Sequence, residues 1–250
     1  MSFDATTVGT TAAEWRSAFA RHRFHQLDLD EVAELLVVAA HPDDETLAAG
    51  GLIAELCSRE LPVHVVIVTD GAASHPNSIT HTAEQLATIR AKEAFTAVAT
   101  LAPGASISLL GFPDGGVLES RDAVAAALQP FLDDTDGNAL VLAPWRGDGH
   151  RDHRVVGELV AVATAGKRTF LEYPVWLWHW ADPRGDDVPW DRLFAVPMRQ
   201  QAQTAKRSAM ASYASQTVAL GELEGDEAVL GAEFLRNFEH PLELFIGAAS

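Results

Sequence analysis

The sequence predicts an α/β protein in which a mostly parallel sheet carries helices on both faces. Short apolar runs alternate with stretches of helical periodicity along most of the chain, which is typical of parallel sheets. The chain has 250 residues, 48% of them hydrophobic and 21% charged, so it can bury a full core. We therefore expect one Rossmann-like, three-layer domain over residues 1–250, with residues 1–10 disordered.

Short apolar runs predict the strands, and apolar residues spaced every three or four positions predict the helices. The expected strands cover residues 35–40, 63–69, 106–110, 139–143 and 169–173. The expected helices cover residues 12–22, 54–59, 84–100, 120–132 and 155–165. Towards the C-terminus we expect a strand at 192–197 and helices at 199–213 and 227–236.

Charge and composition exclude several classes of partner. The formal net charge is −17, which disfavours nucleic acid and anionic membranes as partners. An anionic substrate would need a local positive centre, such as a metal ion or a buried arginine. The single cysteine, Cys57, excludes an intrachain disulfide and a thiolate-rich zinc site. The sequence has no signal-peptide pattern and no apolar run of membrane-spanning length, so we expect a cytoplasmic protein.

A cluster of histidine and carboxylates follows the first predicted strand. The segment His41-Pro-Asp-Asp-Glu45 stands where that strand gives way to a helix. Part of it has a purely structural explanation, since Pro42 suits a first helical turn and acidic residues complement the helix dipole. That explanation leaves His41 unaccounted for. His41 and Asp44 can point at one ion, which leaves Asp43 free for another task.

A second cluster follows the predicted strand at 139–143. Residues 144–149 have the composition of a loop and lead into His150-Arg-Asp-His153. His150 and His153 are three residues apart and lie on one side if a helix begins here. Taken alone, the segment is equally typical of an exposed loop with a helix cap at Asp152.

Together the two clusters make a metal site if both lie at the carboxyl edge of the sheet, where ligands of open α/β sheets bind. His41, Asp44 and His153 would form a mixed nitrogen and oxygen set that suits Zn²⁺ with one open position. Asp43 and a cationic His150 would then be available to accept a proton and to stabilise an oxyanion. Hydrolysis of an amide requires these groups.

The paired motifs resemble the PIG-L/LmbE-like family of zinc-dependent N-deacetylases, which remove acetyl groups from N-acetylglucosamine units. The resemblance runs from about residue 35 to residue 165 and includes Thr69-Asp-Gly71 and Arg90-x-x-Glu93. The segment Phe112-Pro-Asp-Gly-Gly116 matches a loop of the family less tightly.

This resemblance implies a role for each residue of the motifs. The implied zinc ligands are His41, Asp44 and His153. Asp43 becomes the general base, His150 polarises the carbonyl, and Asp152 orients His150 through its ring N–H. Contacts with sugar hydroxyls are implied for Arg90 and Asp114, although Arg90 is equally typical of a helix-surface pair with a neighbouring glutamate.

Two departures from the family pattern bear on the substrate. The family often has proline where this chain has Arg151, which adds a positive charge beside the site. Some members that act on sugar-thiol conjugates have tyrosine at the position of Asp148. No role of that tyrosine can be transferred, so the substrate need not be shared.

Tryptophans crowd the segment 174–191, which we expect to be a long, partly ordered loop that walls a pocket. Trp176, Trp178 and Trp180 alternate, so an extended backbone would place them on one face and His179 on the other. They either pack this connection onto the core or form an aromatic wall against a sugar ring or an apolar aglycone. In the second case His179 would reach the substrate.

The sequence therefore predicts a zinc-dependent hydrolase that removes an N-acetyl group from a small amino sugar conjugate. Such sites also accept Fe²⁺, Co²⁺ or Mn²⁺. The alternatives are a hydrolase of another amide or an ester, and a sugar-binding protein that has lost catalysis. Nucleotide binding is disfavoured because no G-x-G-x-x-G follows the first strand. Whether the chain forms a homo-oligomer is left open.

Overall fold

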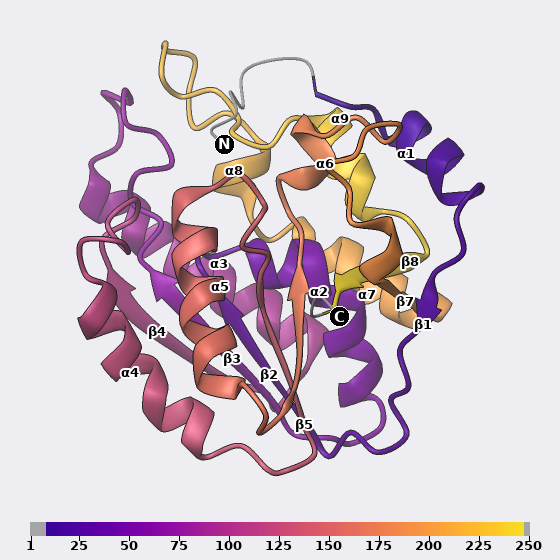
Figure 1. Cartoon of the computed structure of the whole chain (residues 1–250). Helices are drawn as coiled ribbons and strands as arrows, with labels where there is room; N and C mark the ends of the chain where they lie inside the picture. The colour runs from indigo at the N-terminus through magenta and orange to yellow at the C-terminus, as the bar shows by residue number, and fades with distance from the viewer. Residues whose placement is uncertain (1–8, 248–250) are drawn as a thin grey trace.

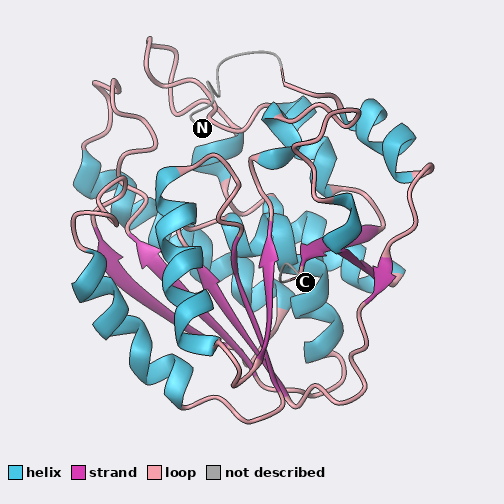
Figure 2. Ribbon diagram, viewed as in Figure 1, coloured by secondary structure: helices cyan, strands magenta, loops and turns pink. Residues whose placement is uncertain are grey.

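The computed structural model describes residues 9–247, and within them an eight-stranded sheet carries helices on both faces (Figure 1, Figure 2). The order of strands across the sheet is β1 (His25–Gln26), β7 (Leu193–Pro197), β8 (Leu242–Ile246), β6 (Thr169–Tyr173), β5 (Ala139–Pro144), β2 (Glu34–Ala39), β3 (Val63–Thr69) and β4 (Ser106–Phe112). Neighbouring strands run parallel except where β8 pairs with β6 and β7. The predicted fold class is confirmed.

The alternation of side chains along the central strand creates two cores. Leu35 and Val37 of β2 belong to one cluster of buried residues, whereas Leu36 and Val38 belong to the other. The helices over the first face are α2 (Asp44–Cys57), α3 (Ala83–Leu101) and α7 (Gln200–Met210), and those over the second are α4 (Arg121–Asp133) and α5 (Arg151–Thr164).

Short helices complete the fold. They are α1 (Ala12–Phe19), α6 (Leu177–Trp180), α8 (Ala214–Thr217), α9 (Ala232–Leu235) and the 3₁₀ turns η1 (Trp190–Arg192) and η2 (Arg236–Phe238). No helix within residues 9–247 is both long enough and apolar enough to cross a bilayer.

Several predictions about the terminal regions are wrong or fall outside the described residues. The helix expected at 227–236 is reduced to α9 followed by a 3₁₀ turn, and the strands β1 and β8 were not predicted. Strand β8 is short and has Glu243 as its second residue, so its local pattern does not indicate a buried strand. Of the residues expected to be disordered, 1–8 lie outside the description, whereas the Thr10 N–H donates to the backbone oxygen of His179 at 2.8 Å.

The order of strands reverses at β2. From β2 the chain continues through β3 and β4 on one side, and then returns to place β5 and β6 on the other side. Strands β2 and β5 are direct neighbours, with Leu35 opposite Leu140 and Val37 opposite Leu142. In open α/β sheets, the crevice at such a switch point is where ligands bind.

The buried carboxylate of Glu243 in β8 holds both α7 and α2. Lys206 of α7 donates to Glu243 at 2.7 Å, and both residues are buried. The backbone N–H groups of Gly51 and Leu52 donate to the same carboxylate at 2.6 and 2.7 Å. Glycine at position 51 leaves room for Met198, because a Cβ there would lie 1.9 Å from its sulfur and would displace that side chain.

We expect Lys206→Met to lower the free energy of unfolding by about 3–5 kcal/mol, because it leaves Glu243 buried with an uncompensated charge. The double variant Lys206→Met/Glu243→Leu should recover much of this loss. Urea denaturation of both variants measures the effect. Arg236→Gln, which breaks an exposed pair with Glu233, is the control and should change stability by about 1 kcal/mol or less. Equal losses in Lys206→Met and Arg236→Gln would show that burial of the pair is unimportant.

Candidate metal centre and active site

Three donor atoms converge in the crevice between β2 and β5. His41 is the second residue after β2, Asp44 opens α2, and His153 lies in the first turn of α5. His41 Nδ1 is 3.2 Å from His153 Nε2 and 3.4 Å from Asp44 Oδ2, and the latter two atoms are 3.3 Å apart. Tetrahedral Zn²⁺ with bonds of 2.0–2.1 Å separates its ligands by about 3.4 Å. The three residues predicted as ligands therefore have the spacing that a zinc ion requires.

Carboxylates on the far side of each ring orient these imidazoles. His153 Nδ1 lies 2.8 Å from Asp148, and His41 Nε2 lies 3.2 Å from Asp114 and 3.4 Å from Asp152. Each carboxylate holds the ring proton on the outer nitrogen, so the inner nitrogens turn lone pairs towards one point. Two lone pairs and a carboxylate oxygen at this spacing repel one another unless a cation lies between them. This arrangement favours a metal ion.

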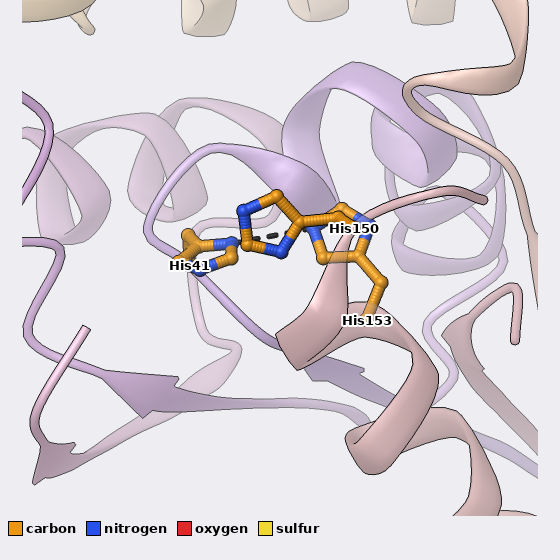
Figure 3. A group of neighbouring side chains, drawn as sticks. All are labelled: His41, His150 and His153. Carbon is orange, nitrogen blue, oxygen red and sulfur yellow. Dashed lines mark hydrogen bonds between the residues drawn. The ribbon is translucent and has the colours of Figure 1, made fainter. Parts of the chain in front are cut away.

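Other combinations of donors are possible at the same place. Figure 3 shows the rings of His41, His150 and His153 gathered together, and their donor atoms lie within 4.8 Å of one another. The donors of His41, Asp114 and Asp152 meet the same limit. That second group uses the outer nitrogen of His41, and its carboxylates also accept backbone N–H groups, from Ala73 at 3.1 Å and Gly115 at 2.8 Å. We therefore interpret Asp114 and Asp152 as partners that orient His41.

Without a metal ion, the convergence of donors attracts protons. Burial opposes a charge on His153, but the charge of Asp44 and the hydrogen bond to Asp148 raise its pKa to about 9. Burial likewise opposes a charge on His41, and the three surrounding aspartates outweigh it and raise its pKa well above the usual value. For Asp44, the nearby imidazoles overcome burial and hold the pKa well below its usual range.

Asp148 is a functional residue that the sequence did not reveal. Its carboxylate is fully buried and accepts the backbone N–H groups of Val175, Trp176 and Leu177 at 2.9–3.0 Å, besides contacting His153. Its own carbonyl oxygen accepts the indole N–H of Trp180 at 2.8 Å. Asp148 thus connects a metal-ligand position to the start of α6. The sequence did contain an indication of this role, since Asp148 stands shortly before His153, a candidate ligand. The outer ring N–H of a ligand histidine needs a hydrogen-bond acceptor.

Asp43 stands beside the donor triangle in a strained conformation. Its φ is 134°, a value that residues other than glycine rarely adopt. The backbone N–H donates to Glu45 at 3.2 Å, and the Tyr213 hydroxyl donates to the same carboxylate at 2.5 Å. Arg90 donates to Asp43 Oδ2 at 2.9 Å. Burial raises the pKa of Asp43 to about 7, although the charge of Arg90 opposes the increase.

Arg90 is not a helix-surface residue, so that interpretation is wrong. It is only 3% exposed, and besides Asp43 its guanidinium donates to the backbone oxygens of Pro42 and Gly71 at 2.5 and 3.0 Å. Arg90 therefore holds the strand-end loops of β2 and β3 together under the site. It also lines the cavity described below, and its predicted contact with a sugar hydroxyl stays a prediction.

The relation between Asp152 and His150 differs from the one expected. The Asp152 carboxylate contacts His41 and not the His150 ring, whereas the Asp152 backbone N–H donates to His150 Nδ1 at 3.2 Å. That bond places the proton of a neutral His150 on Nε2. Burial lowers the pKa of His150 to about 3, with His41 and His153 adding to the effect. Burial and the neighbouring rings therefore disfavour the cationic His150 expected from the sequence, and favour a neutral ring that donates from Nε2.

A cavity of about 1050 Å³ opens over the donor triangle. Its lining includes His41, Asp43 and Asp44 from the first cluster and His150 from the second. Asp114 and the three tryptophans Trp145, Trp176 and Trp180 also line it. The extended conformation expected for the tryptophan segment is wrong, because α6 places Trp176 and Trp180 one turn apart towards the cavity while Trp178 packs in the core. His179 does not line this cavity; its ring is buried beside Gly9, Trp176 and Phe234.

Comparisons with known proteins show the family to which this chain is related. Residues 36–164 match the family model described as PIG-L, GlcNAc-PI de-N-acetylase. The chain is 33% identical over 182 residues to the 1D-myo-inositol 2-acetamido-2-deoxy-alpha-D-glucopyranoside deacetylase of Rhodococcus opacus (strain B4), and the match covers 63% of this chain and 58% of that protein. The protein of the same name from Mycobacterium sp. (strain KMS) is 30% identical over 232 residues, or 74% of each chain. The chain thus spans little more than half the length of the Rhodococcus relative.

Among solved structures, the fold is similar to that of the N,N'-diacetylchitobiose deacetylase from Pyrococcus horikoshii. The TM-score is 0.60 at 22% identity, over 76% of this chain and 72% of that one. The family match covers both histidine and carboxylate clusters and more than half of the chain. The chain belongs to the PIG-L family.

Proposed function

We propose that this chain is a metal-dependent N-deacetylase that hydrolyses the acetyl amide of an N-acetylglucosamine-type conjugate. The observation that carries the proposal is the donor triangle of His41, Asp44 and His153, with the carboxylate of Asp43 beside it in a large cavity. The names of the relatives supply the substrate class, since both are deacetylases of an acetamido sugar conjugate. We propose that residues 1–250 form one catalytic domain. The cytoplasmic location stays a prediction.

His41, Asp44 and His153 would hold the metal ion, which supplies Lewis acidity for hydrolysis near neutral pH. Zn²⁺ suits this mixed set, and other divalent transition metals fit the same donors. Asp148 would keep His153 in the tautomer that leaves Nε2 free to bind. Asp114 and Asp152 would do the same for His41 Nδ1.

Asp43 would move the protons of the reaction. It accepts a proton from the water that attacks the acyl carbon, and returns it to the amine nitrogen as the C–N bond breaks. The products are acetate and a free amine. A carboxyl group with a pKa of about 7 suits both transfers at neutral pH. Glu45 and Arg90 hold the carboxylate in place through the backbone and side chain of Asp43.

His150 would stabilise the charge that develops on the acyl oxygen. Because Nδ1 accepts the backbone N–H of Asp152, the Nε2 proton is available for donation to that oxygen. A neutral imidazole is a poor acid for the leaving amine, so the proton on the amine comes from Asp43 in this mechanism.

We expect Asp43→Asn to lower kcat for acetate release by about 10²–10⁴-fold without loss of bound metal. The substituted side chain cannot accept the proton but has nearly the same shape. Acetate release from a panel of N-acetylglucosamine conjugates measures activity, and elemental analysis measures the metal. Asp187→Asn, at an exposed position on the wall of the same cavity, is the control. Full activity in Asp43→Asn would show that Asp43 is not the general base. If the wild-type protein hydrolyses only other amides or esters, the proposed substrate class is wrong.

We expect the affinity for Zn²⁺ to increase as pH rises from about 6 to about 9. The raised pKa values of His41 and His153 mean that both rings carry an extra proton at neutral pH in the metal-free protein. Binding must displace these protons, so the Kd should fall by up to about tenfold per pH unit for each proton released. Competition with a chromophoric chelator at several pH values measures the Kd. A Kd that does not change with pH would contradict this assignment of ligands.

We expect Asp148→Asn to weaken Zn²⁺ binding by about 10–100-fold, because His153 loses the anionic acceptor for its outer N–H. The same chelator competition measures it. Asp226→Asn is the matched control, since Asp226 is also buried but accepts from Ser78 and Thr80. Equal effects of the two substitutions would indicate a general loss of stability and not a role in holding His153.

A further inference from the structure

Three arginines line one wall of the cavity. They are Arg146, Arg151 and Arg154, and they come from the segment that carries His150 and His153. The chain as a whole has a net charge of −17, so an anionic molecule is repelled by most of its surface. The arginine wall is a local exception, at the place where the substrate must lie.

The three guanidinium groups differ in how they are neutralised. Arg146 donates to the buried Glu172 at 2.7 Å and 3.0 Å and is therefore fully paired. Arg151 pairs with Glu119, and both side chains are exposed. Exposed ion pairs contribute little free energy, so an anionic ligand can replace Glu119 as the partner of Arg151. Arg154 is exposed, and its guanidinium has no hydrogen-bond or ion-pair partner among residues 9–247.

Arg154 is positioned close to the reacting groups. Its backbone N–H donates to the carbonyl oxygen of His150 at 3.1 Å, which places the two residues one helical turn apart on α5. Side chains four residues apart on a helix lie about 5–6 Å from each other at their Cβ atoms. Arg151 precedes Arg154 by three residues and shares its face. Both side chains therefore line the cavity within one helical turn of His150.

We propose that the substrate carries an anionic group, a carboxylate or a phosphate, which Arg154 and Arg151 bind next to the N-acetylated sugar. This inference rests on the proposed function and narrows its substrate class. A planar guanidinium recognises either anion through paired N–H donors. The tryptophans Trp145, Trp176 and Trp180 complete the cavity around this subsite.

The test uses three N-acetylglucosamine glycosides of matched size, with a neutral, a carboxylate-bearing and a phosphate-bearing aglycone. For the zinc-loaded wild-type protein we expect kcat/KM to be about tenfold or more higher for one of the anionic glycosides than for the neutral one. Arg154→Gln should remove most of this advantage by raising KM, with little change in kcat and none for the neutral glycoside. Arg154→Lys should restore part of it.

Arg23→Gln is the matched control, because it makes the same change of charge at an exposed position outside the cavity. The advantage should also shrink as the salt concentration is raised from about 50 mM to about 500 mM. The Kd of each glycoside for the Asp43→Asn variant gives a second measurement that needs no turnover.

The two proposals fail in different ways. If the neutral glycoside is deacetylated as well as the anionic ones, or if Arg154→Gln affects all three equally, the anionic subsite is wrong and the deacetylase remains. If the zinc-loaded protein deacetylates none of them, the proposed function fails, and the Kd values decide the subsite separately. Preference for only the carboxylate or only the phosphate identifies the anion.

Discussion

The parallel pairing of β2 with β5 is the constraint on which the site depends. These strands are separated by about a hundred residues of chain, yet they are direct neighbours at the point where the order of strands reverses. The chain leads from β2 directly to His41 and Asp44, and from β5 through a loop to His153. In the observed register, the donor atoms of His41, Asp44 and His153 lie 3.2–3.4 Å from one another. A shift in register between β2 and β5 would move His153 away from the other two residues.

The electrostatics of the crevice explain why so many charged groups are buried there. Each ligand histidine has a carboxylate on its outer side, and the inner atoms face one another. Such a cluster is unfavourable by itself, because burial penalises every charge in it. A divalent cation at its centre would satisfy all three donors at once. The same carboxylates that make the metal-free cluster attract protons would make the loaded site bind metal firmly.

Much of the support for the site comes from beyond the segment that matches the family. Tyr213 holds Glu45, which in turn holds the strained backbone of Asp43. Glu243 and Lys206 fix the middle of α2, the helix that begins with Asp44. Backbone N–H groups at the start of α6 donate to the carboxylate of Asp148, which in turn contacts the outer ring nitrogen of His153. The N-terminal two thirds of the chain provide the chemical groups and the carboxylates that orient them, and the C-terminal third adds the contacts that fix Glu45, α2 and Asp148.

The sequence by itself determined the alternation of strands and helices and the residue types of both clusters, because periodicity and motif spacing are local properties. It predicted β3 and β6 to the residue and placed His41, Asp44 and His153 as one set of donors. Only the tertiary structure decided which carboxylate orients which ring, that His150 is buried enough to lower its pKa, that His179 packs away from the cavity and that Glu243 lies in a buried strand. Those outcomes depend on contacts with residues that are distant in the chain and on burial, which shifts the pKa of each group. Neither can be read from a local sequence pattern.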